Sequence, residues 1–75
     1  MRETNWSKEA KVLLKTGEVR SGMSGPELAQ FLRISTASYY NRRLNPGTLK
    51  LKELSRLKLV MKFTDDELLF LTGAK

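Results

Sequence analysis

The stretch from Ser24 to Pro46 places two helix starts so close together that few arrangements of the chain accommodate both. The first start is Ser24 followed by Glu27, the pattern of a capping box, and the proline between them is tolerated in a first helical turn. The second start is Ser35, a residue type whose side chain caps helices. Because only a few residues separate the first helix from Ser35, we expect an angled pair of helices.

Both expected helices are short. The first begins at Gly25 and has an apolar stripe that includes Leu28 and Leu32. The second runs from Thr36 to about Arg43 and is stopped by the residues at 45–47, which are asparagine, proline and glycine. Proline cannot continue a helix, and asparagine and glycine favour turns.

A longer helix is expected before this pair. Gly17 and Gly22 are both possible stops for it, so residues 18–22 are either the end of this helix or a loop. The helix is predicted by apolar residues that have the spacing of one helix face: Trp6, Ala10, Leu13 and Leu14.

Two more helices are expected after the pair. Thr64 and Glu67 form a second capping box, from which a short helix runs through Leu71. The helix before it reaches Lys62 and is predicted by an apolar repeat of Leu51, Leu54, Leu57 and Met61. No run of residues alternates with the period of a strand. The sequence therefore predicts an all-α fold, a single small bundle of about five short helices, with residues 1–75 as one domain.

The composition removes several classes of function. The 75 residues include no cysteine and no histidine, so the chain lacks a disulfide, a thiolate metal site and an imidazole base. The carboxylates fall in helix-capping positions, and no pair of acid and base stands out. We therefore expect no enzyme activity, no metal and no cofactor, and no small-molecule ligand is evident.

The hydropathy pattern predicts a protein that stays in the cytoplasm. The longest apolar runs, such as Leu68 to Leu71, are far below the roughly 20 residues that span a bilayer. The N-terminal stretch alternates charged with apolar residues and lacks the apolar run and cleavage site of a signal peptide. We expect no membrane partner.

The positive charge of the chain is concentrated in one segment. The whole sequence has a formal net charge of +6, whereas residues 33–62 have a net charge of +7, with Glu53 as their single acidic residue. A concentrated positive field attracts polyanions, of which nucleic acid is the usual one. An ordinary solvated, lysine-rich surface is the alternative interpretation of the composition alone.

The closely spaced helix pair has the form of a helix-turn-helix, whose second helix enters the major groove of DNA. The segment MSGPELAQFLRIS, residues 23–35, resembles the LS..ELA..LG.S signature of the Cro/C1-type (XRE-like) family of phage repressors. The segment TDDELL, residues 64–69, resembles the S.DELL pattern of that family's last helix. The resemblance covers about two thirds of the chain and implies a lambda-repressor-like fold.

The chain departs from the family pattern in three places. Arg33 stands where the family usually has a glycine, so the turn has to close without a residue that readily accepts a positive φ. Gly25 and Pro26 occupy the region where the family often has a glutamine that contacts DNA. Arg42 replaces the second apolar anchor of the recognition helix. The packing there then falls to Tyr39, Tyr40 and Leu44.

By this resemblance, the residues that face the groove are Thr36 and Ala37, followed one turn later by Tyr40 and Asn41. Asn41 can pair bidentately with adenine, Thr36 can donate or accept at a base edge, and Ala37 can contact a thymine methyl group. Core packing of Tyr40 and simple solvation of Asn41 are the competing interpretations. The expected phosphate contacts, which give affinity without sequence information, are Ser24, Arg42, Arg43, Lys50 and Lys52.

These residues imply a sequence-specific, double-stranded DNA-binding transcription regulator, similar to a phage Cro/C1-type repressor that occupies an operator and blocks transcription. Because a helix-turn-helix monomer of this size covers little DNA, we expect a homodimer at least on DNA, in the cytoplasm of a bacterial host. Phe63 and Phe70 are the expected dimer contacts. The alternative is a protein-interaction module, an antirepressor or modulator of repression on a helix-turn-helix scaffold.

Overall fold

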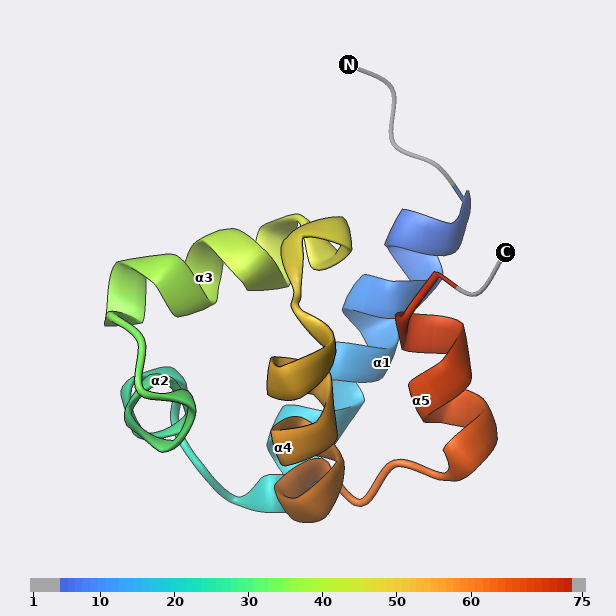
Figure 1. The fold of residues 1–75 in the computed structure, drawn as a ribbon. Coiled ribbons are helices and arrows are strands. Elements are labelled where there is room, and N and C mark those ends of the chain that lie inside the picture. The colour runs from blue at the N-terminus through green and yellow to red at the C-terminus, as the bar shows by residue number, and fades with distance from the viewer. Residues whose placement is uncertain (1–4, 74–75) are drawn as a thin grey trace.

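Five α-helices and one 3₁₀-helix make up residues 5–73, the part of the chain that the computed structural model describes (Figure 1). The described residues contain no strand, so the predicted all-α bundle is confirmed. In Figure 1, α3 and α5 lie on opposite sides of the molecule, with α1 and α4 between them. The elements are α1 (Asn5–Ser21), α2 (Gly25–Leu32), α3 (Thr36–Leu44), η1 (Pro46–Thr48), α4 (Leu51–Met61) and α5 (Asp65–Leu71).

Most of residues 18–22, which the sequence alone does not assign to helix or loop, belong to α1. The helix continues through Ser21 and ends at Gly22, whose φ of 67° a glycine adopts without strain. Gly17 does not stop the helix but lies buried against α4. A Cβ added at Gly17 would stand 2.8 Å from the Cβ of Met61, so the absence of a side chain lets the two helices approach closely.

Three connections between helices share one three-residue construction. Its first residue has a positive φ, which is 67° at Gly22, 62° at Arg33 and 57° at Lys62. Its second residue is apolar, and its third accepts a hydrogen bond from the backbone of the following helix. The capping boxes predicted before α2 and α5 are confirmed. The three junctions are Gly22-Met23-Ser24, Arg33-Ile34-Ser35 and Lys62-Phe63-Thr64.

The turn between α2 and α3 closes in the conformation that a glycine would take, although its residue is Arg33. The Arg33 backbone has φ 62° and ψ 41°, and its N–H donates to the Gln30 carbonyl oxygen at 3.0 Å. The next N–H, of Ile34, donates to Ala29 O at 3.0 Å, which completes a Schellman motif. The left-handed conformation costs an arginine about 1 kcal/mol, and these hydrogen bonds offset that cost.

Phe63, one of the two expected dimer contacts, belongs to the core of the single chain. The positive φ of Lys62 turns the chain inward, and only 4% of Phe63 is exposed. Phe70 is partly buried and packs against the same core. The buried core consists of Ala10, Leu14, Leu28, Ala29, Leu32, Tyr39, Leu54, Leu57, Met61, Phe63 and Leu71.

The last helix, α5, runs antiparallel to α1 and is held near both of its ends. Trp6 Nε1 donates a hydrogen bond of 2.6 Å to the Phe70 carbonyl oxygen, and the two rings lie 6.3 Å apart. The Arg20 guanidinium pairs with Glu67 at 3.5 Å. The end of α5 therefore lies at the start of α1, and the first turn of α5 lies near the end of α1. The two helices thus run side by side along α5.

Candidate nucleic-acid interface

The solvent side of α3 carries all four residues predicted to contact bases. Thr36, Ala37 and Asn41 are exposed, and Tyr40 is 40% exposed. Their spacing of one helical turn puts them in a single stripe along the helix. Leu44 continues the stripe by a further turn and is 61% exposed. We call these five residues the α3 face.

The buried side of α3 is anchored to α1 through one carboxylate. Tyr39 is 2% exposed, and its hydroxyl donates a hydrogen bond to Glu18 Oε2. Arg43 Nε lies 3.2 Å from the same oxygen. Burial, followed by the hydrogen bond to Glu18, raises the pKa of the Tyr39 hydroxyl above its usual value of 10.0. No local sequence pattern identifies Glu18 as a partner of α3, because the contact spans two helices that are distant in the chain.

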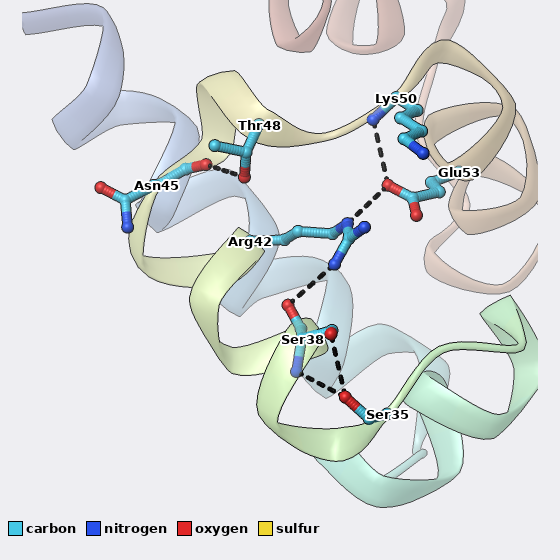
Figure 2. A network of polar contacts seen from close by, with 7 residues as sticks. All are labelled: Ser35, Ser38, Arg42, Asn45, Thr48, Lys50 and Glu53. Carbon is cyan, nitrogen blue, oxygen red and sulfur yellow. Dashed lines mark hydrogen bonds and ion pairs between the residues drawn. The ribbon is translucent and has the colours of Figure 1, made fainter.

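A second carboxylate, that of Glu53, joins the start of α4 to α3 (Figure 2). Its Oε1 atom lies 2.9 Å from Arg42 Nε and accepts a hydrogen bond of 3.0 Å from the Lys50 backbone N–H. Arg42 Nη1 also donates to the Ser38 carbonyl oxygen at 3.2 Å. Only 20% of the Arg42 side chain is exposed. Arg42, a predicted phosphate contact, therefore binds groups of the protein itself, at the position where the family has an apolar anchor. Leu44, which was expected to pack, faces solvent instead.

The other predicted phosphate contacts reach the surface. Lys50 and Lys52 are exposed at the start of α4, and neither forms an ion pair within residues 5–73. The Arg43 side chain is 31% exposed beyond its contact with α1. Ser24 is exposed, but its hydroxyl oxygen already accepts the Glu27 N–H at 3.3 Å. Lys50 and Lys52 are therefore the predicted contacts whose polar groups are most available to phosphates.

Tyr40 leans from α3 toward the start of α2. A Cβ added at Gly25 would stand 2.3 Å from the Tyr40 hydroxyl oxygen and 2.6 Å from its Cζ atom. The Tyr40 ring also meets the Tyr39 ring edge to face, with centroids 5.6 Å apart. The absence of a side chain at Gly25 thus leaves room for the hydroxyl end of the Tyr40 ring.

Neither a metal centre nor a membrane span is found in the described part of the chain. Residues 5–73 contain no group of three or more His, Cys, Asp or Glu side chains that could hold a metal ion. No helix among them is long and apolar enough to cross a membrane. Comparisons of the chain with protein-family models, with curated proteins and with solved structures gave no match. What the α3 face binds is therefore inferred from its own chemistry.

Proposed function

We propose that this protein is a sequence-specific regulator of transcription, similar to Cro/C1-type repressors, that binds a double-stranded DNA operator and blocks transcription. The α3 face is the observation that carries the proposal. It exposes Thr36, Ala37 and Asn41 together on one side of a helix. Hydroxyl, methyl and carboxamide groups are the chemistry with which side chains read base edges in the major groove.

The anchoring of α3 supports this role. Glu18 holds Tyr39 and Arg43 from α1, and Glu53 holds Arg42 from α4. Since the helix is already fixed on its inner side, little conformational freedom is lost when its outer side is bound. A preorganised helix also keeps the exposed side chains in a constant register, which base readout requires.

The positive charge near α3 supports an anionic partner. Lys50 lies beside the Arg42–Glu53 pair (Figure 2), and Lys52 is in the first turn of α4. Arg33, exposed in the turn before α3, adds a third cation without an ion pair in the described residues. Contacts from such cations to phosphates position a protein on the duplex without specifying sequence.

The proposal includes two copies of the chain on a two-fold symmetric operator, in the cytoplasm of a bacterial host. Paired recognition helices are needed because one short helix contacts few base pairs. The second candidate function is docking to another protein, as an antirepressor or modulator of repression. It is favoured by Leu44 and Tyr40, which leave apolar surface exposed on the α3 face.

Selection from random double-stranded oligonucleotides tests the proposal. We expect one sequence to be enriched, and Asn41→Ala to lose about 1–3 kcal/mol of discrimination at one base pair. Lys52→Ala serves as the matched variant, because it should weaken binding to all sequences and reduce the salt dependence by about one counterion. Enrichment of no sequence by the wild-type chain would contradict the proposal and leave protein docking as the function to test.

A further inference from the structure

Both arginines of α3 are engaged by carboxylates of other helices. Arg42 Nε lies 2.9 Å from Glu53 Oε1, and Arg43 Nε lies 3.2 Å from Glu18 Oε2. Arg42 Nη1 also donates to the Ser38 carbonyl oxygen. Bidentate contact from an arginine or a lysine to guanine O6 and N7 is the commonest specific contact in the major groove. The α3 face contains neither residue type, and the two cations of the helix are held by its packing partners.

The α3 face also lacks an acceptor that would select cytosine. Glutamate and aspartate accept a hydrogen bond from the cytosine N4 amino group, and the helix from Thr36 to Leu44 contains neither residue type. The hydroxyl groups of Thr36 and Tyr40 both donate and accept, so neither favours a G·C pair over an A·T pair. A G·C pair in the groove therefore meets no side chain of the α3 face that selects it.

Three residues of the α3 face have the chemistry that matches A·T pairs. The Asn41 carboxamide pairs bidentately with adenine N6 and N7, and Ala37 is an apolar group of the kind that contacts the thymine C5 methyl. Leu44 follows Asn41 by three positions, which puts the two on the same side of the helix. Leu44 is 61% exposed. This leucine gains free energy when a thymine methyl group covers it, because apolar surface is then removed from water.

We infer that the half-site read by α3 consists of A·T pairs, with Asn41 on an adenine and with Ala37 and Leu44 on thymine methyl groups. This assignment rests on the proposed function and adds to it the class of sequence that the operator contains. The exposed cations Arg33 and Lys52 lie outside α3, in the turn before it and in the first turn of α4. They give affinity through phosphates, which are the same in every sequence.

Selection from random double-stranded oligonucleotides, followed by replacement of single thymines with uracil, tests the inference. Parallel selections with Asn41→Ala and Leu44→Ala locate α3 on the operator, because each variant should lose its preference at the base pair that the side chain contacts. We expect A·T pairs at these positions. Uracil pairs as thymine does but lacks the C5 methyl group. Uracil opposite Leu44 should therefore weaken wild-type binding about fourfold, as expected for the loss of one buried carbon.

Three variants make this test specific to the α3 face. In Leu44→Ala, the uracil at that position should have little further effect. Leu69→Ala is the matched control, because Leu69 is 59% exposed on α5, across the molecule from α3 (Figure 1), and this variant should keep the wild-type response to uracil. Asn41→Arg supplies the cation that the α3 face lacks and should change the preferred base at its position from adenine to guanine. Far-UV circular dichroism should show all three variants folded.

The possible outcomes separate this assignment from the proposed function. Selected operators with G·C pairs at the positions that α3 contacts would overturn the assignment and leave the proposed function standing. An A·T operator that the wild-type chain binds equally well with thymine and with uracil would also overturn it, because the methyl groups would then not be read. A chain that enriches no sequence would instead overturn the proposed function, and the assignment with it.

Discussion

Tyr40 fills the space that a side chain at Gly25 would need, with its hydroxyl oxygen 2.3 Å from the position of the missing Cβ. The contact joins the start of α2 to the exposed side of α3, the two helices that the turn at Arg33 connects. Gly25, one of the departures from the family pattern, and Tyr40 are therefore parts of one packing arrangement.

Gly25→Ala should destabilise the protein by about 1–2 kcal/mol, because the new methyl group overlaps the Tyr40 ring. In a Tyr40→Ala background the same substitution should be neutral or slightly stabilising, since alanine is the better helix former. Thermal unfolding of the four proteins gives the coupling between the two positions. A coupling near zero would show that the ring does not occupy this space.

Arg42→Ala should lower the free energy of unfolding by about 3 kcal/mol, because it leaves the carboxylate of Glu53, which is 7% exposed, without its cation. The double variant Arg42→Met with Glu53→Leu should lose less than either single truncation, since no buried charge remains. Urea titrations measure each loss. Lys52→Ala, which removes an exposed cation, is the control, and an equal effect of the two alanine variants would contradict the internal role of Arg42.

Arg33→Gly should stabilise the fold by about 1 kcal/mol, because glycine adopts the positive φ of this position without the cost that arginine has. Gln30→Gly places the same residue inside α2 and should destabilise by about 1 kcal/mol. The difference in thermal unfolding between the two variants checks the backbone conformation at the turn. If Arg33 contacts phosphates, the stabilised variant should also bind DNA more weakly in a titration.

The free energy of unfolding should fall as the pH rises above 10, and Tyr39 should cause part of the fall. Its pKa is raised in the folded state by burial and by Glu18, so above 10.0 the unfolded chain loses a proton that the folded chain keeps. One such group lowers the free energy of unfolding by about 1.4 kcal/mol for each pH unit above its unfolded pKa. At neutral pH both states keep the proton, so this loss does not occur there. Denaturant unfolding of the wild type and Tyr39→Phe between pH 9 and 11 (about one unit on either side of the ordinary value) measures it. Equal slopes would contradict the assignment.

Local signals are sufficient to predict where most helices begin. The hydrogen bonds that cap α2, α3 and α5 join residues three positions apart, so Ser24, Ser35 and Thr64 are recognisable in the sequence alone. The spacing of the α3 face is predicted for the same reason, because residues one turn apart on a helix share a side.

Contacts between helices are not predictable in this way. Glu18 and Glu53 become partners of α3 only when α1 and α4 are packed against it, and this packing leaves 20% of the Arg42 side chain exposed. Phe63 looks like a surface residue in the sequence because a left-handed Lys62 is not expected from its residue type. The packing of Tyr40 on Gly25 likewise depends on the angle between α2 and α3.

Trp6 is the single tryptophan of the chain, and its indole N–H is bonded to the Phe70 carbonyl oxygen in the last helix. Its fluorescence therefore reports the docking of α5 on α1 separately from the circular dichroism of the helices. A change in emission at lower denaturant concentration than the loss of helix signal would reveal an intermediate in which α5 has detached. The native fold thus contains its own probe of whether the molecule unfolds in one step.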